Sequence, residues 1–411
     1  MWINSVYHEK IRFHPSFFFL FYLVEIFALS KVKDHAIKSL KMKKKLLYIA
    51  VIGLWAMGSQ LLLSCSDKTE NPNSKEAQMA AKIVQIVQQN GKADKPGFTY
   101  SIQYDQGIGY GGAVGLASVD PARTLVSNDV FNIASISKQF TAFAILLLEQ
   151  QGKLSLDQSL YTYIPELGEY VKPITIAHLI SHSSGLSDYM ELAIKKGIDG
   201  QYPLSSAETL QHLCELTHTD FEIGTQQDYS NTGYFLLAQI IERVSGQSLK
   251  AFSQENIFNP LGMKNTFIVD HYPIERPYVL SYDETDQPDE VFWTHTGDGQ
   301  VHSTAEDLIL WGENMSTGKV GGLDLVKKFA TAFPAVTPNG RDIINYTPYA
   351  FGIGLSKIQG LDALEHSGGW MSYNCNLIRI PSKKLTIVVL SNSANIDAVE
   401  ISYQLAKALL E

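Results

Sequence analysis

The feature that most constrains the fold is a change of pattern along the chain. Strand-like segments lie near both ends, at residues 97–105 and again at 349–358, 372–380 and 384–392. Between them, apolar spacing predicts helices at 136–151, 174–182, 205–216, 231–245, 248–258 and 304–315. We therefore expect an α/β chain of the α+β type, in which one antiparallel sheet is built from both termini, flanked by helices, and an all-α lobe is inserted.

The sequence also predicts how the chain divides. Residues 1–64 form a targeting region, residues 65–78 a polar tether, and residues 79–411 the folded domain. Within that domain, the α/β part is expected at about 79–134 and 345–411, and the helical lobe at about 135–344.

A glycine-rich stretch at residues 107–112 matches the pattern G-x-G-x-x-G. A dinucleotide-binding loop with this pattern needs a helix directly after it. The strand-like segment AVGLAS at 113–118 follows instead, so we expect these glycines to form the turn of a β-hairpin.

The N-terminal part indicates export. Met42 and three lysines precede an apolar stretch that ends in Leu62-Leu63-Ser64-Cys65, which reads as a secretory signal beginning at Met42. Its end resembles the lipobox of bacterial lipoproteins, which implies lipidation of Cys65 and a periplasm-facing or surface position in the bacterial cell envelope. An uncleaved transmembrane anchor is the alternative, because about 18 apolar residues lie at the lower limit for spanning a bilayer.

Composition narrows the partners. Residues 65–411 carry 24 basic and 39 acidic side chains, a net charge of −15, which argues against a nucleic-acid partner. Besides Cys65 the sequence has two cysteines. We expect Cys214 and Cys375 to be buried thiols rather than to form a disulfide.

Ser135 and Lys138 form an S-x-x-K pattern at the start of an apolar run. Residues three apart share a helix face, so the amine would lie beside the hydroxyl and could take its proton. A capped helix N-terminus accounts for the same residues without any chemistry. The spacing recurs at 30–33 and 316–319, so it decides nothing alone.

Two later motifs add weight. Tyr229-Ser230-Asn231 precedes an apolar helix, a place where capping residues are also common. His366-Ser367-Gly368-Gly369 lies between predicted strands. His295 begins a competing H-x-G pattern, but a turn and a helix follow it, whereas the strands after His366 can place that residue at a sheet edge beside the helical lobe.

Other chemistries fit less well. No G-x-S-x-G occurs, so the nucleophile elbow of α/β-hydrolases is absent. His178 and His182 have a metal-ligand spacing, but residue 179 is leucine where the zinc-protease motif has glutamate, so capping of a helix end is favoured. Gly185 is expected to end that helix in a left-handed conformation. No cofactor and no metal is expected.

In the order Ser135-x-x-Lys138, Tyr229-x-Asn231 and His366-x-Gly368, the chain resembles the serine β-lactamase-like hydrolases. This family includes class C β-lactamases, D-Ala-D-Ala carboxypeptidases, D-aminopeptidases and related esterases. The resemblance covers roughly residues 96–411 and includes the flanking segments HLISHSSGL, IFNPLGMKNTF, STAEDL and YAFGIGL. It implies the β-lactamase/transpeptidase-like fold.

The resemblance assigns roles. Ser135 would attack a carbonyl and form an acyl-enzyme, and Lys138 and Tyr229 would relay the proton. Asn231 would hold Lys138 and the substrate amide, and the His366–Gly369 segment would bind substrate. Within that segment, the backbone N–H of Gly369 would be the second oxyanion donor beside that of Ser135.

His366 stands where many β-lactamases carry lysine, which favours the peptidase and esterase branches. We expect a protonated His366 to hold a substrate carboxylate, so that activity on a carboxylate-bearing peptide falls relative to a neutral ester as pH rises.

We therefore expect a membrane-tethered serine hydrolase that acts through an acyl-enzyme on a small-molecule or peptide amide or ester. The alternative is a penicillin-binding or sensing lipoprotein that does not turn over.

Overall fold

The computed structural model describes residues 74–104, 108–198, 204–290, 292–334, 337–338 and 348–411. The predicted targeting region and residues 65–73 of the predicted tether, Cys65 among them, lie outside these residues. Residues 75–78 belong to a helix rather than to a tether, so the folded domain begins a few residues earlier than predicted. Within the described part of the chain, no helix combines the length and the apolar character needed to cross a membrane.

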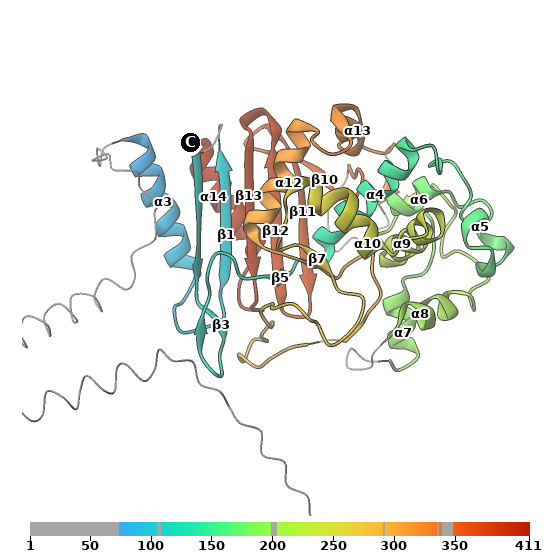
Figure 1. Ribbon diagram of the computed structural model, residues 1–411, viewed down its shortest axis with the longest axis horizontal. Helices are drawn as coiled ribbons and strands as arrows, with labels where there is room; N and C mark the ends of the chain where they lie inside the picture. Colours follow the sequence, from blue (N-terminus) through green and yellow to red (C-terminus); the bar gives the residue numbers. More distant parts are fainter. Residues whose placement is uncertain (1–73, 105–107, 199–203, 291, 335–336, 339–347) are drawn as a thin grey trace, which may run out of the picture. The chain divides into compact units, whose positions relative to one another are not determined.

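A six-stranded antiparallel sheet organises the described domain, with strand order β10-β11-β12-β13-β1-β2. The strands are β1 (Phe98–Tyr104), β2 (Ile108–Val114), β10 (Gly354–Ile358), β11 (Leu361–Trp370), β12 (Tyr373–Ile380) and β13 (Leu385–Ser391). The early strand β1 pairs with the late strand β13, as Figure 1 shows. The prediction of one sheet assembled from both ends of the chain is confirmed.

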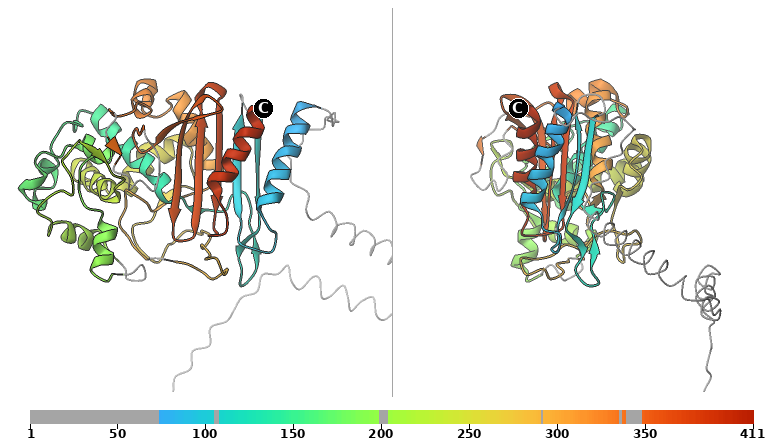
Figure 2. Two further views of the ribbon diagram at one scale, coloured as in Figure 1. Left: turned by 180° about the vertical axis from the view of Figure 1, so that it is seen from behind. Right: turned by 90° about the vertical axis from the view of Figure 1, so that its left-hand side faces the viewer.

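Two helices from opposite ends of the chain cover one face of this sheet. They are α3 (Lys75–Asn90) and α14 (Ala398–Leu410), which lie side by side in Figure 2. All seven residues of β13 are buried, and its side chains alternate between two cores: Ile387 and Val389 pack toward α3 and α14, whereas Val388 and Leu390 face the opposite side. A strand covered on both faces reads as a continuous apolar run, which explains the sequence LTIVVLS.

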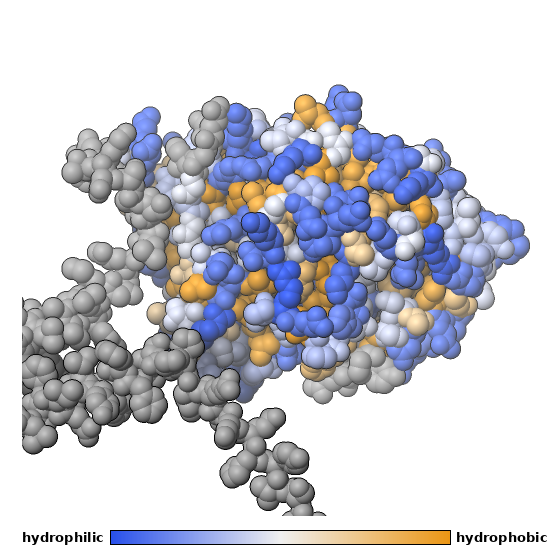
Figure 3. All heavy atoms as spheres, viewed as in Figure 1, coloured by the Kyte–Doolittle hydropathy of each residue, from blue (hydrophilic) through white to orange (hydrophobic). Residues whose placement is uncertain are grey.

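The segment between β2 and β10 supplies the remaining helices. They are α4 (Lys138–Gln150), α5 (Leu160–Tyr163), α6 (Ile176–Ile180), α7 (Tyr189–Lys195), α8 (Ser206–Leu213), α9 (Asn231–Ser245), α10 (Leu249–Ser253), α11 (Asn259–Leu261), α12 (Ala305–Thr317) and α13 (Gly322–Phe329). Each of the six helices predicted for this interval has a counterpart, but the short helices α5, α7, α11 and α13 were not predicted. Figure 3 shows the face of the molecule that is viewed in Figure 1. Hydrophilic residues are spread over this face, and hydrophobic residues are visible between them.

The middle segment is not purely a separate lobe. Helix α12 packs on β1 and β13, and Gly312 allows this approach because a Cβ there would lie 2.6 Å from the Thr386 side chain. The same segment contributes β7 (Phe267–Ile268) and β8 (Val301–Ser303), which join β5 (Phe131–Asn132) in a small sheet. The middle segment therefore packs directly on the interior strands of the main sheet.

The glycine-rich pattern occupies a different place from the one predicted. Gly109, Gly111 and Gly112 lie within β2 and pair with β1, so the expectation that they form the hairpin turn is wrong. A Cβ at Gly112 would lie 3.1 Å from the Tyr100 ring, so glycine makes room for an aromatic side chain across the strand pair. The chain after β2 breaks at Gly115, whose φ is 96°, before β3 (Leu116–Ser118) begins.

Both described cysteines are free thiols, as expected. Cys375 is buried in β12, whereas Cys214 is half-buried at the end of α8, so the prediction of two buried thiols holds for Cys375 alone.

Candidate active site

A cavity of about 350 Å³ opens where the start of α4, the start of α9 and strand β11 meet the loop before β8. Five of the predicted site residues line it: Ser135, Tyr229, Asn231, Ser367 and Gly369. Lys138, Gly368 and His366 are not on its wall. The first and the last of the three motifs are more than 200 residues apart in the sequence, and the fold brings all three to one cavity.

Ser135 is presented by an unusual backbone turn. The Asn132 side chain accepts a hydrogen bond from the Ala134 N–H at 2.9 Å, and Ala134 takes a left-handed conformation with φ 48°. A 3₁₀ turn, Ala134–Ser137, follows and runs directly into α4. Left-handed backbone is uncommon for a residue with a side chain, and such positions concentrate at functional sites.

Lys138 connects the nucleophile candidate to two other elements. Its Nζ lies 3.1 Å from Ser135 Oγ, 2.9 Å from Asn231 Oδ1 and 2.9 Å from the Asp298 carbonyl oxygen. The side chain is fully buried, and this burial lowers the pKa of Lys138 to about 8, against the opposing charges of Asp298 and Asp188. An amine with this pKa is partly neutral near pH 7 and can accept a proton from Ser135.

The Tyr229 ring packs on the same amine, with Lys138 Nζ 4.8 Å from the ring centroid. Its hydroxyl is buried and makes no hydrogen bond of ordinary geometry with a described residue, although the nearby Ser135 hydroxyl partly offsets the effect of burial. Burial dominates and raises the pKa of Tyr229 well above its usual value. The phenol is therefore protonated and can pass a proton rather than act as a resting anion.

Asn231 is held from both sides. Ser230 caps α9 by accepting a hydrogen bond from the Gly233 N–H, and Asp188 accepts a hydrogen bond of 2.7 Å from the Asn231 N–H. The same Asp188 caps α7. The capping interpretation and the functional one are therefore compatible, since the cap is what fixes Asn231 Oδ1 on Lys138. Asp188 was not predicted from the sequence. An aspartate that caps a short helix has no sequence feature to show that it also accepts a hydrogen bond from the Asn231 N–H.

His366 lies behind the cavity wall, contrary to its predicted position as a substrate-binding residue. The side chain is fully buried, its Nδ1 lies 2.6 Å from the Ser367 carbonyl and its Nε2 lies 3.0 Å from Tyr349 Oη. Burial, with a further contribution from the charge of Lys138, lowers the pKa of His366 to about 3. A neutral, enclosed imidazole does not fit the expectation that a protonated His366 binds a substrate carboxylate.

The two glycines after Ser367 differ in their surroundings. A Cβ at Gly368 would lie 2.3 Å from the Ile133 carbonyl oxygen, so glycine is needed for β11 to pack against the turn that carries Ser135. A Cβ at Gly369 would meet nothing within 4 Å, and Gly369 lines the cavity. Gly368 therefore sets the spacing between strand and nucleophile, and Gly369 leaves its backbone accessible from the cavity.

A second wall was missed by the sequence analysis. Tyr189 Oη donates a hydrogen bond of 2.7 Å to Asp298 Oδ2 and also contacts His295 Nε2. Asp298, His295 and Gln300 line the cavity. His295 was set aside as the weaker H-x-G pattern, yet it is the histidine on the cavity wall. These residues come from a loop and from α7, where no regular spacing marks them.

The remaining candidates have structural roles. Ser137 is fully buried, and its Oγ accepts a hydrogen bond from the Val301 N–H at 3.1 Å. His178 Nδ1 accepts a hydrogen bond from the Thr175 N–H in a capping box. Gly185 is left-handed, with a φ of 73°, but α6 already ends at Ile180 with Ser181 as its C-cap, so the expectation that Gly185 ends this helix is wrong. Within the described ranges, no group of three or more His, Cys, Asp or Glu residues is arranged to hold a metal ion.

The family model described as Beta-lactamase matches residues 81–410. The chain belongs to the beta-lactamase family. This confirms the resemblance and, with it, the β-lactamase/transpeptidase-like fold.

Relatives with known names lie on several branches. A penicillin-binding protein of Bacillus subtilis (strain 168) is 32% identical, over 69% of this chain and 65% of its own length. A D-aminopeptidase of Gluconobacter oxydans (strain 621H) is 24% identical, over 72% of this chain and 55% of its own length. The chain thus spans less than two thirds of the length of these relatives.

Solved structures agree on the fold. The octameric penicillin-binding protein homologue from Pyrococcus abyssi superposes with a TM-score of 0.68 at 26% identity, over 82% of this chain and 77% of that one. A class C beta-lactamase superposes with a TM-score of 0.67 at 20% identity, over 83% of this chain and 99% of that one.

Proposed function

We propose that this protein is a serine hydrolase that cleaves an amide or ester through an acyl-enzyme on Ser135. The observation that carries the proposal is the 3.1 Å contact between Ser135 Oγ and a buried Lys138 amine whose pKa is lowered to about 8, at the wall of a cavity. A hydroxyl beside a base of suitable pKa is the arrangement required for nucleophilic catalysis.

The chemistry follows from these contacts. Ser135 Oγ attacks the carbonyl carbon, and its proton passes to the neutral Lys138 amine, directly or through the Tyr229 hydroxyl. The backbone N–H groups of Ser135 and Gly369 stabilise the oxyanion. The proton then goes to the leaving nitrogen or oxygen as its bond to carbon breaks. A water molecule adds to the acyl-serine ester with the same base, which releases a carboxylic acid and restores the Ser135 hydroxyl.

The similarity to a penicillin-binding protein supports a second candidate, in which the protein acylates but does not turn over. The first step is the same, and the difference lies in the rate of deacylation. Sustained release of product from a reporter ester supports the hydrolase, and a single stoichiometric burst supports the non-turnover protein.

The experiment that tests the nucleophile is covalent labelling with a fluorophosphonate. Wild type and Ser137→Ala should be labelled, and Ser135→Ala should not. Labelling that persists in Ser135→Ala and disappears in Ser137→Ala would reverse the assignment. A panel of a cephalosporin, a D-Ala-D-Ala peptide, a D-aminoacyl amide and a short-chain ester then identifies the substrate class.

We also propose that Cys65 carries a lipid anchor and that the protein works in the bacterial cell envelope. The support is the basic start and the sequence Leu62-Leu63-Ser64-Cys65. In a Gram-negative host, the wild type should incorporate a labelled fatty acid and lose its leader, and Cys65→Ala should not be labelled. An unmodified Cys65 within an intact N-terminal segment would favour the transmembrane-anchor alternative.

A further inference from the structure

His182 lies one residue after the C-cap of α6 and takes no part in the chemistry proposed above. The residue is 1% exposed, and its backbone is left-handed, with a φ of 59°. Its ring nitrogen Nε2 is buried and has no hydrogen-bond partner among the described residues. Left-handed backbone and an unpaired buried polar atom both cost free energy, and such features concentrate at functional sites. A residue that only filled the core would need neither of them.

His182 holds both chain neighbours of Tyr229 by hydrogen bonds. Its carbonyl oxygen accepts from the Asp228 N–H at 2.9 Å, and its ring nitrogen Nδ1 accepts from the Ser230 N–H at 3.0 Å. A backbone N–H can only donate, so Nδ1 carries no proton and the single proton of the neutral ring is on Nε2. The backbone on either side of Tyr229 is therefore tied to one residue.

The ring of His182 also packs on the ring of Tyr229. The two ring centroids are 4.4 Å apart, with 32° between the planes. Tyr229 depends on such packing because its buried hydroxyl makes no hydrogen bond of ordinary geometry with a described residue. The Lys138 amine lies 4.8 Å from the centroid of the same tyrosine ring. The position of the hydroxyl near Ser135 is thus set by ring packing and by the backbone, and His182 contributes to both.

The surroundings of His182 keep its ring neutral. Burial lowers the pKa of His182 well below its ordinary value, and the charge of Lys138 acts in the same direction. The rings of Tyr234 and Tyr349, which also pack against it, bring no negative charge that would favour the imidazolium. A protonated ring would turn an N–H on Nδ1 toward the Ser230 N–H. His182 therefore acts on Tyr229 by its contacts and not by transferring a proton itself.

We propose that His182 is a positioning residue for the proton transfer at Ser135, and that it acts through Tyr229. Its two hydrogen bonds fix the backbone beside the tyrosine, and its ring fixes the phenol. This inference rests on the proposed function, since it concerns the hydroxyl through which the Ser135 proton passes to Lys138.

The test measures the rate at which a fluorophosphonate labels Ser135, because loss of the Ser135 proton is common to the hydrolase and to the non-turnover protein. Two substitutions each remove one contact. His182→Asn keeps an acceptor bonded to Cγ for the Ser230 N–H and tolerates the left-handed backbone, but it lacks the ring. His182→Phe keeps a ring but lacks the acceptor. Each should slow labelling about tenfold or more, and Tyr229→Phe should slow it about 10²-fold.

The decisive comparison repeats both His182 substitutions in the Tyr229→Phe protein. A residue that acts through the phenol hydroxyl has nothing left to position once the hydroxyl is gone. The His182 substitutions should then slow labelling by less than about threefold, whereas a general structural role would slow it by the same factor in both backgrounds. His182→Asn provides the comparison even if His182→Phe does not fold.

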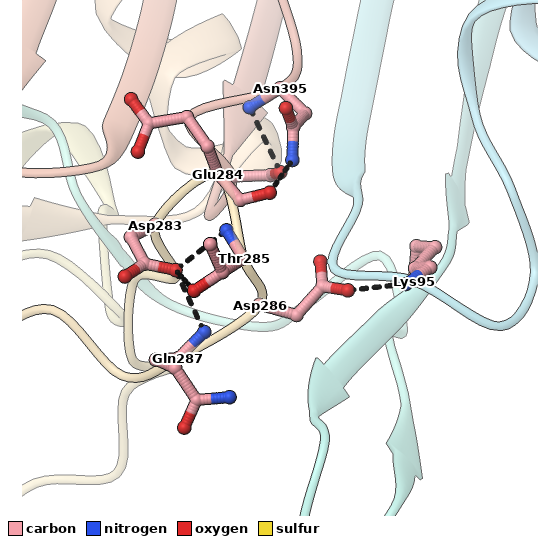
Figure 4. A network of polar contacts seen from close by, with 8 residues as sticks. Lys95, Asp283, Glu284, Thr285, Asp286, Gln287 and Asn395 are labelled. Atoms are coloured by element: carbon pink, nitrogen blue, oxygen red, sulfur yellow. Dashed lines mark hydrogen bonds and ion pairs between the residues drawn. The ribbon is translucent and has the colours of Figure 1, made fainter.

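Two controls accompany the comparison. His178→Asn changes a second histidine, four residues earlier, whose ring belongs to the capping box of α6 and which does not line the cavity. Asp286→Asn changes a carboxylate that pairs with Lys95 in the network of Figure 4, away from the cavity-lining residues. Both variants should be labelled at the rate of the wild type.

Equal factors in the two backgrounds would overturn the positioning role, as would labelling of both His182 variants at the wild-type rate. It would also be overturned if Tyr229→Phe were labelled as fast as the wild type, because no proton would then pass through the hydroxyl. These results leave the proposed function intact, since Ser135 of the wild type is still labelled. Failure of the fluorophosphonate to label Ser135 at all would instead overturn the proposed function, and the positioning role with it.

Discussion

The two walls of the cavity differ in how their polar atoms are used. On the wall that carries Ser135, the Lys138 amine makes three hydrogen bonds within the protein. On the opposite wall, Asp298 and Gln300 each keep one buried oxygen without a partner among the described residues. The hydrogen bonds around Lys138 are complete before any ligand arrives, whereas the buried hydroxyl of Tyr229 and the two oxygens of Asp298 and Gln300 remain without a partner among the described residues.

The catalytic wall, which carries Ser135, therefore holds its groups in two ways. A catalytic group must be held in its reactive position in advance, so its neighbours belong to the protein. Lys138 is held by its own hydrogen bonds, whereas Tyr229 is held by the ring and the backbone contacts around it. The following changes test how much of the activity rests on the catalytic wall.

The largest effect is expected from Lys138→Met. The substitution removes the proposed base while it keeps a long side chain in the buried site, so kcat/KM for a neutral ester should fall by about 10³-fold or more. The free energy of unfolding should fall by only about 1–3 kcal/mol, because the substitution leaves Asn231 Oδ1 and the Asp298 carbonyl without their donor but keeps the buried volume filled. Steady-state kinetics and urea denaturation measure the two quantities.

The expectation fails if Lys138→Met retains activity within tenfold of the wild type. A loss of both activity and folding would mean that the amine holds the three elements together, and Lys138→Gln, which can still bond Asn231 or the Asp298 carbonyl, then separates the two roles.

Gly368 and Gly369 provide a comparison within the catalytic wall. Gly368→Ala should lower the free energy of unfolding by about 1–3 kcal/mol, because its methyl group would meet the Ile133 carbonyl oxygen. Gly369→Ala should change it by less than about 0.5 kcal/mol, because its methyl group would enter the open cavity. Urea denaturation of both variants gives the comparison, and equal destabilisation would contradict the packing described for β11.

The pKa of Lys138 predicts a pH dependence. The neutral amine is the base, so kcat/KM for a neutral ester should rise about tenfold per pH unit below about pH 8 and level off above it. Residual activity of Lys138→Met should lack this transition. A wild-type profile that is flat from pH 6 to 8 would show that the base has already lost its proton, and that burial lowers its pKa further than the structure indicates.

The sequence predicted the catalytic wall because its residues obey local spacing rules. Ser135 and Lys138 are one helical turn apart, and Asn231 begins a helix, so each pattern can be found without knowing the fold. The family resemblance then joined these patterns across residues that are far apart. The sheet could be predicted for a similar reason, since a fully buried strand such as β13 has an unmistakable apolar run.

The opposite wall could not be predicted, because its residues obey no such rule. Asp298 and Gln300 lie in a loop, and Tyr189 begins the short helix α7. What unites them is that they converge in space and that some of their atoms remain unpaired, which is a property of the folded protein. The choice between His295 and His366 met the same difficulty: both have the H-x-G pattern and both are buried, and the fold alone shows that His295 lines the cavity whereas His366 lies behind its wall.

The smallest effect is expected from the titration of His366. A carbonyl can only accept, so Nδ1 of His366 donates to the Ser367 carbonyl, and Nε2 then accepts from the Tyr349 hydroxyl. Both ring nitrogens are satisfied in the neutral form, and adding a proton would disturb the Tyr349 contact close to the Lys138 charge. With a pKa lowered to about 3, His366 stays neutral from pH 5 to 9.

The measurement is the ratio of kcat/KM for a carboxylate-bearing peptide to kcat/KM for a neutral ester. This ratio should not change through a histidine pKa between pH 5 and 9, provided that acylation limits both substrates and the contribution of Lys138 cancels. A ratio that falls as pH rises through a value between 5 and 9, and that no longer falls in His366→Gln, would show that His366 reaches the substrate in its protonated form, and that the catalytic wall also recognises the substrate.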